Sequence, residues 1–279
     1  MVQEVAGSNP VGRPSVMRVH LVQFDIAWED KPTNWGKVES MLQDAAVEAG
    51  GVIVLPELGD VGFSMDVNQT ADDRSQAWAA SLANQTGCWV VHGWAQHSDT
   101  GTCENVAGVL TPNGTLQGVA TKLHPFSLIE GGESYQAGNT LKIFRDIAGT
   151  NLCPLICYDL RFPEVFRAAS LAGADCFVVM ANWPAVRLEH WRTLAIARAI
   201  ENQTAVIACN RTGTDPNFTY GGGSLVVAAD GQVLAEAGEE STILTAEIDF
   251  QAQLAWRGAF PALGDAKPHW QCPAPIAWH

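Results

Sequence analysis

The sequence predicts an α/β protein built as a single domain. Short apolar runs alternate with longer runs of helical period, which is typical of βα units and of a mostly parallel arrangement of strands. Hydrophobic residues make up 47% of the 279 positions and charged residues only 16%, which favours a deep core with much surface hidden in an oligomer. No Pro-, Gly- or Ser-rich linker divides the chain. We therefore expect one domain over residues 17–266, preceded by a flexible extension over 1–16 and followed by an extended tail over 267–279.

The first half of the chain carries the signals of strands, helices and one hairpin. Continuous apolar runs indicate strands covered on both faces, and apolar residues at helical spacing indicate amphipathic helices. Pro112-Asn113-Gly114 is a strong turn signal between two alternating runs, and such a turn joins the strands of a hairpin. The predicted elements are strands over 17–26, 51–57 and 88–95, helices over 34–50 and 72–87, and a hairpin over 105–123.

The second half repeats this alternation. A helix is bounded by Pro163 at its start and Gly173 just past its end, which is the asymmetry that helix termini prefer. Asp230-Gly231 marks the turn of a second hairpin. The predicted elements are strands over 151–157, 175–183 and 205–210, helices over 163–172 and 188–203, and a hairpin over 221–237.

Charge and cysteine content exclude several classes of function. The net charge of −14 and the pI near 4.8 argue against nucleic acid, because neutralising phosphates requires clustered Lys and Arg. No apolar run is long enough for a transmembrane helix, and the N-terminus lacks the apolar segment of a secretory signal. Seven cysteines, an odd number, fit reduced thiols in the cytoplasm better than a disulfide framework.

Polar or reactive side chains follow several of the predicted buried strands. Glu57 ends the run GVIVLPE, Cys157 ends NLCPLIC, and Asn182 with Trp183 ends CFVVMANW. Ligands of open α/β sheets bind beyond the carboxyl ends of the strands, so we expect these residues to share one pocket. The alternative for each of them is that it only marks where a strand leaves the core. The run VIAC leads into Asn210 and Arg211 in the same way, and for these two residues the interpretations weigh equally.

Cys157 is the candidate nucleophile, because it lies between a strand and the N-terminal end of a predicted helix, where N–H donors stabilise a thiolate. The other cysteines within apolar runs are interpreted as small core residues. A thiol needs a base, yet no histidine carries a protease-like signature, and His124 is interpreted as structural or as part of the pocket wall. The sequence has no HExxH, HxH or paired CxxC, so neither metal nor cofactor is implied. The groups that remain as candidates to assist the thiol are a carboxylate that acts as the base and a lysine that supplies a positive charge.

Three motifs resemble the nitrilase superfamily of carbon–nitrogen hydrolases. They are VIVLPELGDVGFS around Glu57, ATKLHPFSLIEGGESYQAGN around Lys122, and LICYDLRFPE around Cys157, and they occur in the same order as in that family. The similarity spans roughly residues 17–265, and its details resemble the omega-amidase-like branch. The resemblance implies a four-layer αββα sandwich in which two sheets face each other, and dimers that join through helical layers.

The resemblance also implies a role for each matching residue. Cys157 corresponds to the nucleophile, Glu57 to the general base, and Lys122 to the cation beside the oxyanion, with the Tyr158 N–H as the second donor. The family has a further glutamate soon after the lysine. Glu130 matches that position best, and Glu133 is the competing candidate.

We therefore predict a thiol amidohydrolase that releases ammonia from a small ω-amide, with a 2-oxo acid amide such as 2-oxoglutaramate as the first candidate. Alternatives are another C–N substrate (an N-carbamoyl amine, an acyl amide or a nitrile) or a non-catalytic binding subunit. Arg161 either holds a substrate carboxylate or, as the favoured interpretation, pairs with an acid inside the fold. Partners are expected to be a small-molecule amide and further copies of the chain, as a homodimer or larger homo-oligomer. The candidate substrate-binding residues are Tyr158, Asn182, Trp183 and Arg187.

Overall fold

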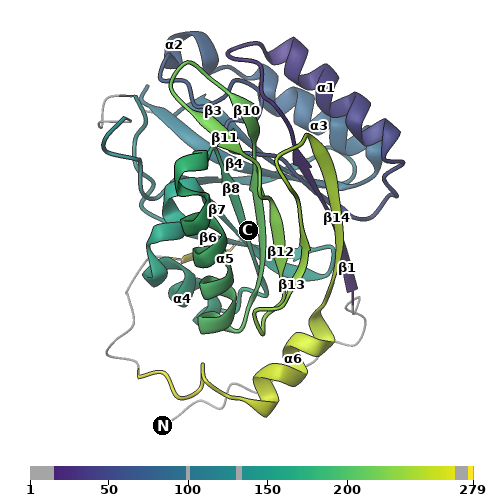
Figure 1. The fold of residues 1–279 in the computed structure, drawn as a ribbon, viewed down its shortest axis with the longest axis vertical. Coiled ribbons are helices and arrows are strands. Elements are labelled where there is room, and N and C mark those ends of the chain that lie inside the picture. Colours follow the sequence, from purple (N-terminus) through teal and green to yellow (C-terminus); the bar gives the residue numbers. More distant parts are fainter. Residues whose placement is uncertain (1–15, 99–100, 130–133, 268–275, 279) are drawn as a thin grey trace.

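Two β-sheets lie face to face and each carries helices on its outer face (Figure 1). The computed structural model describes residues 16–98, 101–129, 134–267 and 276–278. Helices α1 (Lys31–Asp44) and α3 (Arg74–Thr86) cover one sheet, and α4 (Pro163–Leu171) and α5 (Leu188–Asn202) cover the other. This is the four-layer αββα sandwich that the sequence predicts.

The first sheet has the strand order β14-β1-β2-β3-β4-β5. Its centre is parallel, because β1 pairs with β2 and β2 with β3 in the same direction, whereas β14, β4 and β5 are antiparallel to their neighbours. The hairpin predicted from Pro112-Asn113-Gly114 forms between β4 and β5, and the Gly114 N–H donates to the Thr111 carbonyl at 2.8 Å. The strands are β1 (Val16–Gln23), β2 (Val52–Val54), β3 (Trp89–His97), β4 (Cys103–Leu110), β5 (Leu116–Thr121) and β14 (Thr242–Asp249).

The second sheet has the order β13-β12-β9-β8-β7-β6-β15. Strands β7, β8 and β9 run parallel, and β15 is parallel to β6, while β6, β12 and β13 form the antiparallel pairs. The strands are β6 (Leu141–Ile147), β7 (Thr150–Ile156), β8 (Cys176–Ala181), β9 (Ala205–Asn210), β12 (Leu225–Val227), β13 (Val233–Glu236) and β15 (Ile276–Trp278). A short ribbon pairs β10 (Thr212–Thr214) with β11 (Thr219–Gly221).

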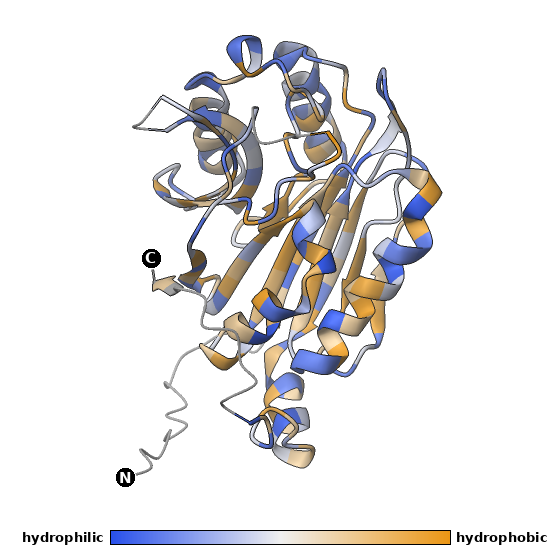
Figure 2. Cartoon of the chain, turned by 90° about the vertical axis from the view of Figure 1, so that its left-hand side faces the viewer, coloured by the Kyte–Doolittle hydropathy of each residue, from blue (hydrophilic) through white to orange (hydrophobic). Residues whose placement is uncertain are grey.

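Three apolar layers hold the sandwich together. Side chains such as Val54 and Val178 fill the space between the sheets, Ile53 packs against α1 and α3, and Phe177 packs against α4 and α5. Figure 2 shows strands coloured mainly as hydrophobic, with helices that alternate hydrophobic and hydrophilic faces. The central strands bury both of their faces, which explains why their sequences read as continuous apolar runs.

The structure corrects several sequence predictions. The arrangement of strands is mixed rather than mostly parallel, since antiparallel strands flank each parallel centre. Helix α1 begins at Lys31, behind an N-cap at Asp30, and ends at Asp44 instead of spanning 34–50. The strand expected over 51–57 is only Val52–Val54, because the chain leaves the sheet toward Pro56, which has no N–H to donate to a ladder.

Several elements carry no sequence prediction. These are β6, the β10–β11 ribbon, β14, the four-residue α2 (Val67–Thr70) and α6 (Phe250–Ala259). The predicted extension over 1–16 lies outside the described residues except for Val16, which belongs to β1. Most of the predicted tail also lies outside them, and its described end forms β15. Among the helices of the described residues, none is both long and apolar enough to cross a membrane.

Candidate active site

Glu57 lies in the loop that follows β2 and is 0% exposed to solvent. Its Oε1 accepts hydrogen bonds from Lys122 Nζ at 2.8 Å and from Asn105 Nδ2 at 2.8 Å. Its Oε2 accepts one from the Asn182 backbone N–H at 3.0 Å. Asn182 Nδ2 also donates to the Glu57 carbonyl at 2.6 Å. Side chains from both sheets therefore fix this carboxylate.

The environment of Glu57 keeps its carboxyl group ionised. Burial raises the pKa of Glu57, because a charged carboxylate loses its hydration, but the Lys122 ammonium and the hydrogen bonds from Lys122, Asn182 and Asn105 outweigh that effect. The net result is a pKa below the ordinary value for glutamate. Glu57 is thus a buried carboxylate that stays ionised beside the Lys122 ammonium.

Lys122 follows the last residue of β5, and only 1% of its surface is exposed. Its backbone N–H donates to the Asn105 carbonyl at 2.9 Å, and its own carbonyl accepts from Gly138 N–H at 2.8 Å. The ammonium lies 5.2 Å from the centre of the Phe63 ring, within the range of a cation–π contact. The side chain is therefore held between Glu57 and an aromatic wall.

Cys157 lies at a sharp turn between β7 and the short 3₁₀-helix η1 (Cys157–Arg161). Its φ of +48° is in the left-handed region, which costs free energy for any residue with a side chain and is common at functional turns. The thiol Sγ is 3.9 Å from the Asn182 carbonyl oxygen, to which it donates. Asn182 thus contacts Cys157 through its carbonyl and Glu57 through its N–H groups.

The backbone around this turn is anchored by buried charged groups. The Asp159 carboxylate accepts from the Ile156 N–H at 2.9 Å and from the His124 N–H at 2.8 Å. Arg198 Nε and Nη2 both donate to the Leu160 carbonyl, at 3.1 and 2.8 Å. Asp159 and Arg198 are 1% and 4% exposed. The turn that presents the thiol is therefore fixed from two sides.

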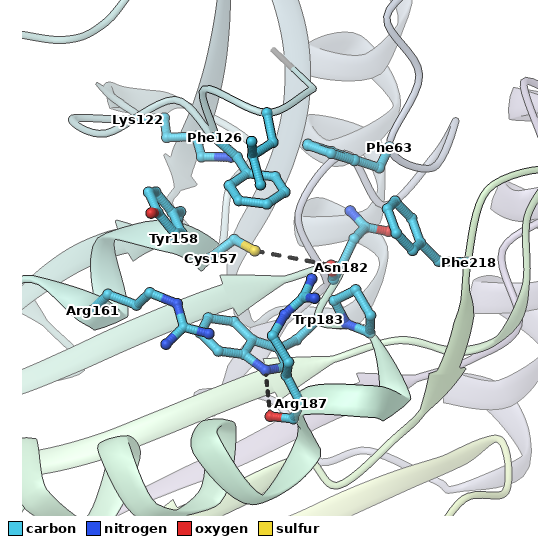
Figure 3. Close-up of a pocket in the computed structure, with 12 residues that line it drawn as sticks. Phe63, Lys122, Phe126, Cys157, Tyr158, Arg161, Asn182, Trp183, Arg187 and Phe218 are labelled. Carbon is cyan, nitrogen blue, oxygen red and sulfur yellow. Dashed lines mark hydrogen bonds between the residues drawn. The ribbon is translucent and has the colours of Figure 1, made fainter. Parts of the chain in front are cut away.

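A cavity of about 200 Å³ opens onto the thiol (Figure 3). Of the residues predicted to form the site, Lys122 and Cys157 line it, and so do the four predicted substrate-binding residues Tyr158, Asn182, Trp183 and Arg187. Glu57 does not line it, and contacts Lys122 behind the wall. The apolar part of the lining, for which the sequence carries no prediction, consists of Phe63, Phe126, Leu128, Pro184 and Phe218.

Some predicted residues occupy other positions. Arg161 lines the cavity, with its guanidinium 4.9 Å from the Trp183 ring, and pairs with no acid in the described part of the chain, contrary to the favoured interpretation. His124 stacks on Phe162 with ring centres 3.8 Å apart, and its Nδ1 lies 2.8 Å from Asp159, as expected of a structural histidine. Glu130 and Glu133 lie outside the described residues.

Asn210 and Arg211 are structural. Asn210 accepts from the Trp183 N–H and donates to the Gly222 carbonyl, so it joins the chain after β8 to the chain before β12. Arg211 is buried, and its guanidinium donates to the Ile26 carbonyl and lies over the Tyr220 ring at 4.3 Å. Neither residue lines the cavity, and both hold backbone segments in place through hydrogen bonds.

Two residues that hold the site were missed from the sequence. Asn105 comes directly before the apolar run of β4 and alternates with Ala107 and Val109, and Asp159 follows Cys157 by two positions. A buried polar residue inside an apolar alternation is the signal that could have identified Asn105, because such residues are normally hydrogen-bonded.

Among the described residues no group of three or more His, Cys, Asp or Glu side chains could hold a metal ion.

Comparison with known proteins identifies the family. The Carbon-nitrogen hydrolase family matches residues 18–257. A 2-oxoglutaramate amidase from Bacillus subtilis (strain 168) is 34% identical over 253 residues, 89% of this chain and 97% of that protein. Omega-amidase YafV from Escherichia coli (strain K12) is 34% identical over 254 residues, 90% and 96% of the two chains. The solved structure of XC1258 from Xanthomonas campestris, a CN-hydrolase superfamily protein with an arsenic adduct in its active site, has a TM-score of 0.83 and 31% identity over 90% of this chain and 97% of that one. These similarities confirm the predicted family and sandwich: the chain belongs to the carbon–nitrogen hydrolase family.

Proposed function

We propose that this protein is a thiol amidohydrolase that cleaves a small ω-amide to an acid and ammonia through a cysteine thioester. The observation that carries the proposal is the buried Glu57–Lys122 pair, with a 2.8 Å contact, at the wall of a cavity that also exposes the Cys157 thiol. Relatives named 2-oxoglutaramate amidase and omega-amidase support this substrate class. A 2-oxo acid amide such as 2-oxoglutaramate is accordingly the first candidate substrate.

In the acylation step, Cys157 Sγ attacks the carbonyl carbon of the amide and forms the C–S bond. Glu57 accepts the thiol proton and passes it to the leaving nitrogen, so the C–N bond breaks and ammonia departs. Lys122 and the Tyr158 N–H stabilise the oxyanion of the tetrahedral intermediate. The Tyr158 N–H belongs to the first turn of η1, where N–H groups have no acceptor within the helix.

In the deacylation step, Glu57 removes a proton from water, which attacks the thioester carbon. The C–S bond breaks, the proton returns to the sulfur, and the acid product leaves. A carboxylate whose pKa lies below the ordinary value is a weak base at rest. When the Lys122 ammonium turns toward the oxyanion, Glu57 loses part of the interaction that lowers its pKa, so its basicity rises during the reaction.

The remaining site residues have supporting roles in this proposal. Asn182 positions both Glu57 and the sulfur, since it contacts each of them. Tyr158 and Trp183 shape the cavity, and Arg187 contacts the substrate. The further glutamate of the family, Glu130 or else Glu133, is proposed to orient Lys122.

The proposal extends to the cellular setting and to assembly. The six described cysteines carry free thiols, which fits a reducing compartment such as the cytoplasm.

A homodimer is proposed because α6 and the residue that follows it present large apolar side chains to solvent: Leu254, Trp256 and Phe260 are 47%, 38% and 56% exposed. Sedimentation of the purified protein tests the dimer.

The proposed activity is tested by measuring ammonia release from a panel of small amides, including ω-amides, N-carbamoyl amines and a nitrile. We expect turnover of ω-amides that disappears in Cys157→Ala, whereas Cys88→Ala, a change at a buried cysteine outside the cavity, retains it. Thermal unfolding checks that each variant folds. Mass spectrometry of Glu57→Gln after mixing with substrate is expected to detect an acyl group on Cys157. Full turnover in folded Cys157→Ala contradicts the mechanism.

A further inference from the structure

A buried cluster of polar and charged side chains lies in the β10–β11 ribbon, apart from the groups assigned to the reaction. It consists of Arg211, Asp215 and Tyr220, whose side chains are all buried. The Tyr220 hydroxyl donates to Asp215 Oδ2 at 2.5 Å, and Arg211 Nη1 lies 3.9 Å from the same oxygen. Burial and then the Asp215 carboxylate raise the pKa of Tyr220, so its hydroxyl keeps the proton that it donates. Ionised groups are costly to bury, and here their contacts fix the backbone next to the cavity.

The Asp215 carboxylate closes the turn of the ribbon. Its Oδ1 accepts from the backbone N–H groups of Asn217 and Phe218, each at 2.8 Å. The Asp215 N–H in turn donates to the Phe218 carbonyl at 2.9 Å. Phe218 lines the cavity, and Figure 3 shows Phe218 and Tyr158 on opposite sides of it. One buried carboxylate therefore sets the position of this aromatic wall.

The other two members of the cluster reach two further parts of the wall. Tyr220 forms an antiparallel bridge with Pro184, which lines the cavity. Arg211 lies against Gly62, since a Cβ added to that glycine would be 3.3 Å from Arg211 Nη1. Phe63, the next residue, also lines the cavity. The cluster therefore supports the backbone at three of the apolar wall residues, although none of its own members lines the cavity.

We infer that Asp215 is a positioning residue: through Tyr220 and the turn at Phe218 it fixes the apolar wall that holds the amide against Cys157. For its effect on turnover this inference rests on the proposed function. A displacement of about 1 Å between the reacting groups can cost about 100-fold in rate. A wall fixed by hydrogen bonds and an ion pair therefore favours attack by the sulfur more than a wall that moves.

Thiol labelling tests the position of the wall without turnover. Methyl methanethiosulfonate is a small reagent, whereas N-phenylmaleimide carries a ring that needs space inside the cavity. In Asp215→Ala, the rate of labelling at Cys157 by the bulky reagent, divided by that of the small one, is expected to rise about 10-fold, because a wall that opens more often admits the larger molecule. Asp215→Asn keeps an acceptor for the two backbone N–H groups, so its ratio is expected to lie between those of the wild type and Asp215→Ala. Peptide mapping assigns the label, and thermal unfolding checks that each variant folds.

Ammonia release from 2-oxoglutaramate tests what the wall contributes to the reaction. Asp215→Ala and Phe218→Ala are each expected to lose about 10- to 100-fold in kcat, with smaller changes in KM, because the wall orients the amide. If Asp215 acts through Phe218, the double variant Asp215→Ala/Phe218→Ala loses little more than either single variant. If the two residues act separately, their losses multiply.

Asp230→Ala is the matched control, because Asp230 also accepts from a backbone N–H in a hairpin turn, that of Gln232 at 2.9 Å, and does not line the cavity. It is expected to keep the wild-type labelling ratio and turnover. An unchanged labelling ratio in folded Asp215→Ala, or losses that multiply in the double variant, overturns the inference; should Asp215→Ala not fold, the ratio in Asp215→Asn decides. A wild type that releases no ammonia, together with a raised labelling ratio in Asp215→Ala, would instead contradict the proposed function and support the positioning role.

Discussion

Replacing Lys122 by methionine is expected to lower the free energy of unfolding, because Glu57 then stays buried without its counter-ion. The two side chains are 1% and 0% exposed, and Lys122 Nζ lies 2.8 Å from Glu57 Oε1. Methionine has a similar length but no charge, so the variant leaves a carboxylate in the core without this ammonium. Breaking a buried ion pair from one side costs about 3–5 kcal/mol of the free energy of unfolding.

The pH dependence of this cost has a definite sign. In the wild type the pKa of Glu57 is lowered, so its contribution to stability is present above its unfolded pKa of about 4.5 and is lost as the pH falls through its folded pKa. In Lys122→Met, burial is the largest remaining influence and raises the pKa of Glu57. Protonated Glu57 is then tolerated at low pH, and stability falls as the pH rises. The loss in the free energy of unfolding of Lys122→Met, relative to the wild type, should be larger at pH 8 than at pH 5 by about 1–3 kcal/mol.

Urea unfolding at pH 5 and pH 8 measures these differences for Lys122→Met and for the double variant Glu57→Gln/Lys122→Met. The double variant removes both charges, so it should be more stable than Lys122→Met at pH 8 and should lose the pH dependence of the pair. An equal deficit for Lys122→Met at both pH values would refute the reasoning. A double variant less stable than Lys122→Met at pH 8 would refute it equally.

Three further predictions concern the supports of the site and its thiol. In Gly93→Ala the new Cβ would lie 3.0 Å from Glu57 Cα and 2.8 Å from the following backbone nitrogen. We expect a loss of about 1–3 kcal/mol in urea unfolding and reduced turnover, whereas Gly36→Ala, which meets no atom within 4 Å, should show neither. Asp159→Asn should cost about 2–3 kcal/mol and at least about 10-fold in kcat, because charge-assisted hydrogen bonds across the site are weakened; wild-type values for both would contradict its anchoring role. Brief iodoacetamide treatment at pH 7.5 should label Cys157 first among the six described cysteines, since the other five are buried; peptide mapping that finds another of the six labelled first would contradict this.

The central strands and the two hairpins were predictable from the sequence, whereas β6 and the edge strand β14 were not. Strand β9 occupies the predicted range 205–210, because a strand buried on both faces leaves a continuous apolar run. Strand β14 buries only Ala246 and Ile248, so half of its side chains are polar and its pattern is weak. The mixed direction of the strands could not be predicted either. Whether two strands run parallel or antiparallel depends on which strands become neighbours and not on the composition of a single strand.

The position of the site was predictable only in part. The rule that ligands bind beyond the carboxyl ends of strands selected Glu57, Cys157 and Asn182, and these residues do lie together. Lys122 came from the family resemblance, because a lysine at the end of a hairpin strand has no pattern of its own. The partners of Arg161 could not be foreseen, since its contact with Trp183 depends on a turn that joins another strand of the sheet.

The geometry of the site suggests why two sheets are needed to build it. Glu57 and Lys122 follow strands of one sheet, whereas Cys157 and Asn182 follow strands of the other. Two residues tie the halves together: Asn182 joins Glu57 to the sulfur, and Asp159 joins the turn at Cys157 to the backbone just after Lys122. A relative movement of the sheets would separate the ammonium from the thiol. Because these links join two sheets that pack through a rigid apolar core, they fix the distance between the groups proposed to react. Orientation of that kind lowers the barrier of a reaction because the entropy of bringing the groups together is already lost on folding.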